Sequence, residues 1–400
     1  MSEKLISHSP DLLRLRDEGY EVEVRHGFLV MHSVPYANSR REVALGKLVT
    51  NLSVNGDRTL PPGDHQVWFA GEHPCNADGS AMKGIGNDHG RRVLCEGLEV
   101  DHRFSCKLPG GVQYPDFHAK MTEYVRIVSH PAKALDPSVD ACTFKPILSP
   151  EDDTVFLYTD SASSRAGIAN ISRKLAQSRI AIVGLGGTGS FVLDLIAKSP
   201  VSEIHLFDGD TFFQHNAFRA PGAASIEELT ERLPKVEYFA RIYKKMRRGI
   251  VPHAEFLTNE NIDQLEGYDF VFVCVDRPAV RGFLAKFLMA HGIPFVDAGM
   301  EIELIEEEQF LVGTCRVTAC TPEKSDHFSR HVSSNGVNGD DLYASNIQVA
   351  DLNALCAVMA VIKWKKLCSF YQDCIGEHQS AYAINAHQLT KDEATKLPAL

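Results

Sequence analysis

The sequence lacks several features that would direct it toward common classes of function. Its ten cysteines, at positions 75, 95, 106, 142, 274, 315, 320, 356, 368 and 374, form no C-x-x-C pair, which disfavours a structural zinc site. The longest apolar stretch, Leu352 to Ile362, is too short to span a bilayer, and the start MSEKLISHSP has no apolar signal-peptide core. The 52 acidic residues outnumber the 41 lysines and arginines. We therefore expect a cytoplasmic protein that binds neither membranes nor nucleic acids.

Length and composition divide the 400 residues into two expected domains. From Tyr20 to about Lys145 the chain is rich in short alternating strands, with one helix expected from Asp116 to Val128. This half contains no repeat, no phosphate loop and no set of ligands at metal-binding spacing. Residues 146–164 have the composition of a linker. The sequence therefore predicts a smaller α+β domain over residues 1–150 and a second domain over residues 151–400.

The second half alternates short apolar strands with helices. We expect strands at 179–183, 203–207, 270–275 and 294–297, and helices at 187–198, 235–246 and 278–291. This alternation is typical of an α/β fold with a doubly wound, Rossmann-like and mainly parallel sheet. A later segment, Ile347 to Lys365, is apolar nearly all round and predicts a buried helix.

A glycine-rich loop follows the first of these strands directly. Gly184, Gly186, Gly187 and Gly189 satisfy the pattern G-x-G-x-x-G between a strand and a helix. Glycines let the backbone approach a polyphosphate, whose charge is met by backbone amides and the helix N-terminal dipole. Asp208 closes the second strand about twenty residues further on, where an acidic residue commonly binds a ribose hydroxyl. The loop therefore predicts a bound nucleotide, although NAD enzymes carry the same pattern.

The residues after the loop distinguish between nucleotides. In chain order they are Asp208, Asp210, Asn216, Arg219, Lys235 and Asp276. This set, which reads D-x-D, N-x-x-R, a Lys at a helix start and an Asp at a strand end, resembles the ThiF/MoeB/ubiquitin-activating family over more than half of the chain. The resemblance implies a ThiF-type adenylation domain that uses ATP and Mg²⁺ to activate the C-terminal carboxylate of a small partner protein.

The resemblance also implies a role for each residue. The glycines, Asp208, Asp210 and Asn216 would bind the nucleotide, and Asp276 would hold Mg²⁺. A carboxylate that attacks the α-phosphate expels pyrophosphate, so the site needs positive charge, which Arg219 and Lys235 would supply. Family members also insert an arginine from the segment before the glycine strand into the partner subunit's site. Arg165 is the nearest match and Arg173 the second, which implies a homodimer.

The fate of the activated carboxylate depends on cysteines. ThiF-like and MoeB-like activators of sulfur carriers usually hold zinc through two C-x-x-C pairs, which this chain lacks. Ubiquitin-activating relatives carry a thioester-forming cysteine in a crossover loop, and Cys320 lies in the corresponding region, before a polar stretch near 320–345. A nucleophile there should be partly exposed with a depressed pKa. Cys315 is the second candidate, and an inert thiol at Cys320 is the alternative.

Several functions remain open at this point. The leading one is a ubiquitin-like protein activating enzyme, which adenylates a ubiquitin-like protein with a C-terminal glycine and passes the thioester to a ubiquitin-conjugating-type enzyme. The chain resembles the ThiF-domain proteins of bacterial antiviral operons of the Bil type, in which residues 1–150 would dock a partner or replace an inactive adenylation domain. The alternatives are a sulfur-carrier adenylyltransferase, an NAD-dependent oxidoreductase and a non-catalytic scaffold.

Overall fold

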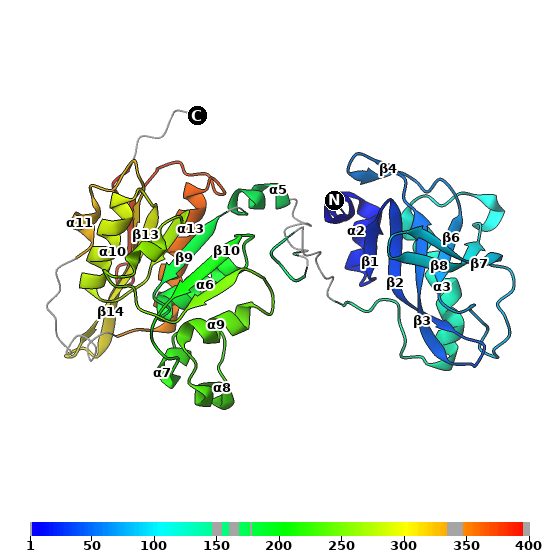
Figure 1. Ribbon diagram of the computed structural model, residues 1–400, viewed down its shortest axis with the longest axis horizontal. Helices are drawn as coiled ribbons and strands as arrows, with labels where there is room; N and C mark the ends of the chain where they lie inside the picture. Colours follow the sequence, from blue (N-terminus) through cyan, green and yellow to red (C-terminus); the bar gives the residue numbers. More distant parts are fainter. Residues whose placement is uncertain are drawn as a thin grey trace. The chain divides into compact units, whose positions relative to one another are not determined.

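The chain forms two compact units (Figure 1). The computed structural model describes residues 2–145, 154–158, 160, 168–176, 178–333 and 347–394. The first unit comprises Met1–Ile147 with Thr159–Ile168, and the second comprises Leu148–Tyr158 with Ala169–Leu400. Among the described residues, no helix combines the length and the hydropathy that crossing a bilayer requires.

The first unit is built on an antiparallel sheet. Its six strands lie in the order β1-β2-β3-β6-β8-β7. Their bounds are β1 Val22–Arg25, β2 Phe28–Ala37, β3 Val43–Asn51, β6 Gln66–Ala70, β7 Gly86–Cys95 and β8 Leu98–Ser105. A small hairpin joins β4 Val54–Asn55 to β5 Arg58–Thr59, and the helical elements are α1 Ser2–His8, α2 Pro10–Asp17, η1 Pro109–Gly111 and α3 Phe117–Leu135. This unit has the α+β composition expected from the sequence.

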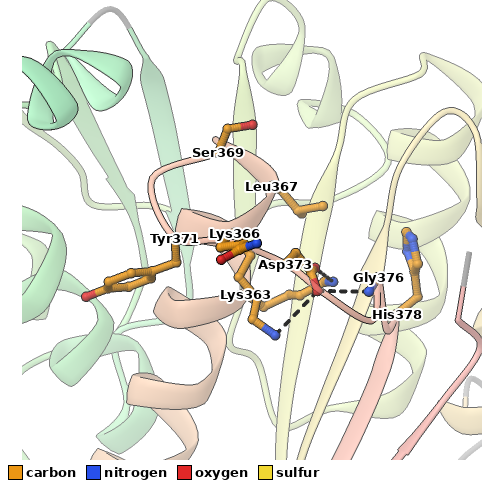
Figure 2. Close-up of a pocket in the computed structure, with 9 residues that line it drawn as sticks. Lys363, Lys366, Leu367, Ser369, Tyr371, Asp373, Gly376 and His378 are labelled. Carbon is orange, nitrogen blue, oxygen red and sulfur yellow. Dashed lines mark hydrogen bonds and ion pairs between the residues drawn. The ribbon is translucent and has the colours of Figure 1, made fainter. Parts of the chain in front are cut away.

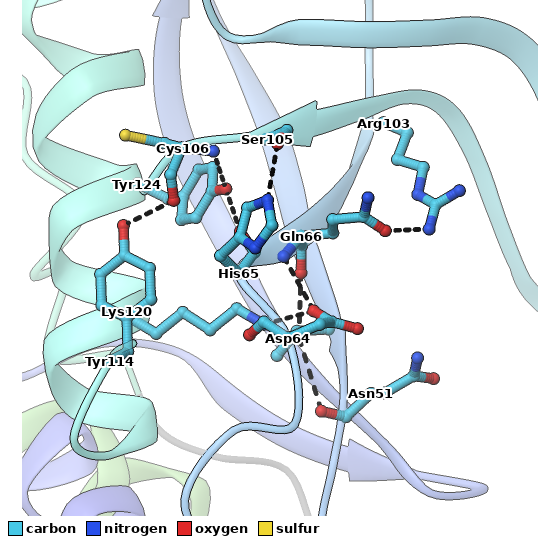
Figure 3. A network of polar contacts seen from close by, with 11 residues as sticks. Asn51, Asp64, His65, Gln66, Arg103, Ser105, Cys106, Tyr114, Lys120 and Tyr124 are labelled. Carbon is cyan, nitrogen blue, oxygen red and sulfur yellow. Dashed lines mark hydrogen bonds and ion pairs between the residues drawn. The ribbon is translucent and has the colours of Figure 1, made fainter. Parts of the chain in front are cut away.

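Helix α3 packs its apolar face against the sheet, which confirms the predicted helix and extends it. Asp116 caps the helix by accepting a hydrogen bond from the amide of Ala119 at 2.7 Å. Lys120 is buried on the sheet side, and its Nζ donates to the hydroxyl of Thr50 at 2.8 Å and to the carboxylate of Asp64 at 3.1 Å (Figure 3). Burial lowers the pKa of Lys120, against the opposing effect of Asp64. The lysine therefore links the helix to the loop that enters β6.

The second unit contains an eight-stranded sheet in the order β11-β10-β9-β12-β13-β14-β15-β16. The strands are β9 Arg179–Val183, β10 Glu203–Phe207, β11 Ile250–His253, β12 Phe270–Val273, β13 Phe295–Ile305, β14 Phe310–Cys320, β15 Gln379–Ala383 and β16 Gln388–Asp392. Strands β11 to β13 pair in parallel and the last four pair antiparallel. The predicted doubly wound α/β sheet is confirmed. The strands after β9 lie first on one side of it, as β10 and β11, and then on the other, as β12 and β13. Such sheets bind ligands at this switch point between β9 and β12.

Helices cover both faces of this sheet, because its central strands are buried on both sides. Ile180 and Ile182 of β9 pack on one face with α6 Gly187–Ala197, α9 Lys235–Tyr243 and α13 Ala350–Leu367. Ala181 and Val183 pack on the other face with α10 Pro278–Ala290 and η3 Ile262–Leu265. The shorter helical elements are α5 Ala169–Ser172, η2 Arg173–Leu175, α7 Gln214–Ala217, α8 Ile226–Glu231 and α11 Phe328–His331.

Helix α13 differs from its prediction in one respect. Cys356, Ala360 and Trp364 are buried against the sheet and α6, as expected. Val358 and Ile362 lie on the opposite side and are 38% and 41% exposed. The prediction of burial all round is therefore wrong, because the helix packs on the sheet through one face only.

Candidate functional site

The glycine loop joins β9 to α6 in a conformation that only glycine tolerates at two positions. Gly184 has φ +90°, and a Cβ there would lie 2.8 Å from the carbonyl oxygen of Cys274. A Cβ on Gly189 would lie 1.9 Å from the carbonyl oxygen of Gly184. At Gly186, by contrast, a Cβ would meet no atom within 4 Å. The loop is thus tightly closed underneath and open above Gly186, on the side where a phosphate could approach.

Asp208 holds this loop from below. Its carboxylate accepts the amide of Leu185 at 2.6 Å and the amide of Asp210 at 2.8 Å. The side chain is 7% exposed, and burial raises the pKa of Asp208 against the lowering effects of Lys235 and the two amides. The position at the end of β10 agrees with the sequence, and both carboxylate oxygens already fix the backbone of the loop.

Lys235 begins α9 and is buried beside two carboxylates. Its Nζ lies 2.7 Å from Asp210 and 3.7 Å from Asp208, and its amide donates to the carbonyl oxygen of Asp210 at 2.8 Å. Burial lowers the pKa of His215, and the charges of Arg219 and Lys235 lower it further. The structure therefore brings the predicted D-x-D pair and the lysine together, and the charges of Arg219 and Lys235 both act on His215.

Asn216 and Arg219 each keep a buried donor without a partner among the described residues. The amide oxygen of Asn216 accepts the backbone amide of Phe213 at 2.9 Å, which fixes the orientation of the side chain. Its Nδ2 and the Nε of Arg219 are buried and make no hydrogen bond in the described part of the chain. Buried donors without acceptors are costly, about 1–3 kcal/mol each, so this pair suits an anionic ligand.

The structure describes Asp276 and Arg173 but not Arg165. Asp276 follows β12 at the carboxyl edge of the parallel sheet, is exposed, and has no partner within the described residues. Its free carboxylate suits a hard cation such as Mg²⁺. Arg165 lies outside the described residues, and Arg173 is an exposed residue that begins η2, just before β9.

Two polar groups at this edge were missed by the sequence analysis. Asn353 of α13 is buried, and its Oδ1 accepts a hydrogen bond from the hydroxyl of Thr188 in the loop at 2.9 Å. Asp297, fully buried in β13, is held 2.7 Å from Arg316 and 3.4 Å from Arg281. A polar residue in the apolar segment around Asn353 and an Asp at the end of a predicted strand were the available signals.

The predicted environment of Cys320 is wrong. Cys320 ends β14, pairs with Phe295 of β13 and is 1% exposed. Burial raises its pKa to about 12, and the carboxylates of Asp297 and Asp326 act in the same direction. Cys315 is fully buried in the same strand and contacts the carbonyl oxygen of Leu352. In the described conformation neither thiol has the exposure that a nucleophile needs. Residues 334–345 of the expected crossover loop lie outside the described residues.

A cavity of about 370 Å³ lies elsewhere in this unit (Figure 2). Lys363 and Lys366 of α13 line it together with Asp373, and the two ammonium groups lie 3.3 Å and 3.7 Å from this carboxylate. Asn353, which contacts the glycine loop, precedes these two lysines on the same helix by about 15–20 Å at 1.5 Å per residue. The cavity is therefore not the nucleotide site.

Comparison with known proteins gives partial matches. The chain is 32% identical over 127 residues to "Adenylyltransferase and sulfurtransferase UBA4" of Yarrowia lipolytica, covering 31% of this chain and 31% of that protein. It is 28% identical over 184 residues to "Ubiquitin-like modifier-activating enzyme 5" of Aedes aegypti, covering 44% and 40%. The chain thus spans between about a third and two fifths of these relatives' length. A crystal structure of Escherichia coli MccB with ATP matches 60% of this chain and 71% of its own, with 17% identity and a TM-score of 0.45.

Family models cover nearly the whole chain. Residues 10–161 match a domain of unknown function (DUF6791). Residues 154–398, more than half of the sequence, match the ThiF family, and the chain therefore belongs to the ThiF family.

Proposed function

We propose that the chain is an adenylating enzyme that activates the C-terminal carboxylate of a small partner protein with ATP. The observation that carries this proposal is the pair of buried donors, on Asn216 and Arg219, that have no partner among the described residues. The charges of Arg219 and Lys235 both act on His215 beside them. Membership of the ThiF family and the names of two relatives, an adenylyltransferase and a modifier-activating enzyme, support it.

The reaction follows from the charges of the site. The carboxylate of the partner protein attacks the α-phosphate, an acyl-adenylate forms, and pyrophosphate leaves. The amides of the glycine loop and the α6 N-terminus meet the phosphate charge. Arg219 and Lys235 stabilise the charge that develops on the leaving pyrophosphate. Lys235 is already paired with Asp210, so nucleotide binding would redistribute this ion pair.

Mg²⁺ belongs to this proposal through Asp276. The carboxylate is exposed at the sheet edge and unpaired within the described residues, so it fits a hard divalent ion. A bound Mg²⁺ would neutralise phosphate charge. Asp276 would hold the ion in place, together with phosphate oxygens and water.

The later steps extend the proposal beyond the adenylate. We propose a ubiquitin-like protein with a C-terminal glycine as the substrate, a thioester as the next intermediate, and a ubiquitin-conjugating-type enzyme as the acceptor, in an antiviral operon of the Bil type. The thioester forms when a thiolate attacks the acyl-adenylate and AMP leaves. The sequence favours Cys320 for this attack, and its burial means that β14 must release its last residue first.

A sulfur-carrier adenylyltransferase is the second candidate, because several relatives are named adenylyltransferase and sulfurtransferase. Both candidates share the adenylation step. They differ in the product: a thiol-sensitive adduct of the carrier on this chain supports the first candidate, whereas a carrier thiocarboxylate formed with a sulfur donor supports the second.

Nucleotide binding tests the first step without a known carrier. Isothermal titration of the full chain with MgATP should show binding, and NADH should show none. Arg219→Ala should weaken MgATP binding about tenfold or more, since a charged hydrogen bond is worth about 1.5–3 kcal/mol. The control, Arg232→Ala, removes an exposed arginine from the same region and should bind normally. NADH binding without MgATP binding would favour an oxidoreductase instead.

A further inference from the structure

Three histidines of the first unit form a compact triangle outside the nucleotide site. His73 follows β6, His89 lies in β7 and His102 lies in β8, where the strand register pairs it with His89. The ring centres are 5.1 Å, 5.2 Å and 5.3 Å apart. The three rings come from three separate segments, and the fold alone brings them together.

The size of this triangle matches that of a metal site. Imidazole nitrogens bind zinc at about 2.1 Å, which places the ring centres about 3 Å from the ion and about 5 Å from each other in tetrahedral geometry. The Nδ1 atoms of His89 and His102 are 3.1 Å apart, at hydrogen-bond distance without a metal ion, and this separation is also close to the about 3.4 Å between two tetrahedral nitrogen ligands at that bond length. Two of the three rings are therefore already spaced as chelating ligands.

The chemistry of the cluster also favours a cation that accepts nitrogen lone pairs. The Nδ1 of His73 is buried and has no hydrogen-bond partner among the described residues. Burial lowers the pKa of His102, and the neighbouring His73 and His89 lower it further. Neutral imidazoles suit zinc and similar divalent ions.

We propose that His73, His89 and His102 bind one divalent transition-metal ion, of the zinc class, in the first unit. The nitrogens of the three rings do not yet converge. Among the described residues, the group whose ligand atoms lie within 4.8 Å of one another is His331 with Asp392 and Glu393, and not these three histidines. The ring of His73 must therefore turn toward the other two. His89 is exposed, which leaves the fourth position of the ion to water or to a substrate oxygen. The ion would tie the β7–β8 hairpin to the segment after β6.

The other group, His331 with Asp392 and Glu393, is a weaker candidate for a metal site. Its ligand atoms lie within 4.8 Å of one another. Glu393 is already paired with Arg330 at 2.8 Å and Lys324 at 3.3 Å. Cations already occupy this carboxylate, and a metal ion would have to displace them. Among the described contacts of the three histidines, none is with a lysine or an arginine.

Cobalt titration of the full chain tests the proposal. The protein is stripped of metal with a chelator and titrated with Co²⁺ as the probe. We expect one equivalent to bind with the visible absorption of a four-coordinate ion, and Zn²⁺ to displace it. His89→Ala and His102→Ala should each weaken binding about a hundredfold or more, because even indirect ligand partners change affinity 10–100-fold.

Two control variants keep the test decisive. His130→Ala removes an exposed histidine of the same unit, and His331→Ala removes the competing group; both should keep the cobalt spectrum. Far-UV circular dichroism and thermal unfolding without metal verify that His89→Ala folds, as its exposed position on the hairpin predicts. Absence of the spectrum in the wild type, its persistence in the His89 and His102 variants, or its loss in His331→Ala would each overturn the proposal.

Discussion

The hydroxyl of Thr188 donates a hydrogen bond of 2.9 Å to the side-chain oxygen of Asn353. Thr188 lies in the glycine loop and Asn353 lies 165 residues later in α13. A Cβ on Gly187 would lie 2.3 Å from the same asparagine. The N-termini of two helices thus meet at the loop, and the loop depends on a residue from the far end of the sequence.

This contact predicts that Thr188 and Asn353 stabilise the fold as a pair. Asn353→Ala leaves the hydroxyl of Thr188 without its acceptor and should lower the free energy of unfolding by about 1–2 kcal/mol. It should also weaken MgATP binding. Thr188→Val should have the same effect, and the double variant should be no worse than either single variant, as measured in a double-mutant cycle by denaturant unfolding. Additive losses would show that the two side chains act independently.

Two glycines of the loop should respond differently to alanine. Gly189→Ala places a Cβ 1.9 Å from the carbonyl oxygen of Gly184 and should destabilise the second unit by about 2–3 kcal/mol. Gly186→Ala meets nothing within 4 Å and should leave thermal stability within about 0.5 kcal/mol of wild type. It should nevertheless weaken MgATP binding, because the methyl group enters the space predicted for phosphate. Equal thermal destabilisation by both variants would argue against an open face above Gly186.

Asp373 should make the stability of the second unit sensitive to acid. Burial would raise its pKa, but the amides of Gly376 and Ile375 and the ammonium groups of Lys363 and Lys366 bring it from 3.8 down to about 2. A depressed folded pKa means that the stabilisation is present above pH 4 and is lost as pH falls toward 2. Asp373→Asn should therefore cost about 2 kcal/mol at pH 7 and almost nothing near pH 2.

Urea unfolding of wild type and Asp373→Asn at several pH values measures this difference. Asp136→Asn in the first unit is the control, because that aspartate is half-buried and its side chain contacts only Ser138 in its own turn among the described residues. A constant difference between wild type and Asp373→Asn across pH would show that the carboxylate charge is not the cause.

The cysteines should differ in reactivity toward an alkylating reagent. Cys374 is exposed, whereas Cys320 is 1% exposed with its pKa raised to about 12. Short treatment of the native chain with iodoacetamide, followed by peptide mapping, should modify Cys374 first and leave Cys320 unmodified. If Cys320 forms the thioester, its labelling should increase when MgATP and a carrier are present under conditions that prevent the acyl transfer. Rapid labelling of Cys320 in the free chain would show that β14 opens on its own.

The proposed homodimer predicts complementation between two defective chains. If Arg165 acts in the partner subunit's site, an Arg165→Ala chain and an Asp276→Ala chain each lack activity alone. Mixed dimers would contain one intact site, so an equal mixture should recover about a quarter of wild-type activity after subunit exchange. No recovery, with exchange verified by mass spectrometry, would place Arg165 outside the site or within its own subunit's site.

The sequence predicted the parts of the site that depend on local order. Strands such as Arg179–Val183 were placed correctly because an apolar run before a glycine loop has few alternatives. The loop, Asp208 and Lys235 follow one another closely in the chain, so the resemblance to a known family located them together. Their roles in catalysis remain predictions.

The sequence failed where contacts join distant segments. Asn353 and the Asp297–Arg316 pair lie at the loop edge only because the sheet and α13 fold back on it. The three histidines were missed for the same reason, since their spacing along the chain matches no metal-binding pattern. Cys320 was expected in the region of the crossover loop and partly exposed, whereas the antiparallel pairing of β13 with β14 buries it.

Carrier-dependent exchange of pyrophosphate into ATP tests the central claim most directly. The wild-type chain, incubated with a small glycine-terminated protein encoded beside it, MgATP and labelled pyrophosphate, should form labelled ATP. Asp276→Ala should abolish the exchange, and Asp263→Ala, which removes an exposed carboxylate from η3, should leave it intact. Full exchange in Asp276→Ala, or no exchange in the wild type with the carrier shown to bind, would contradict adenylation at this site.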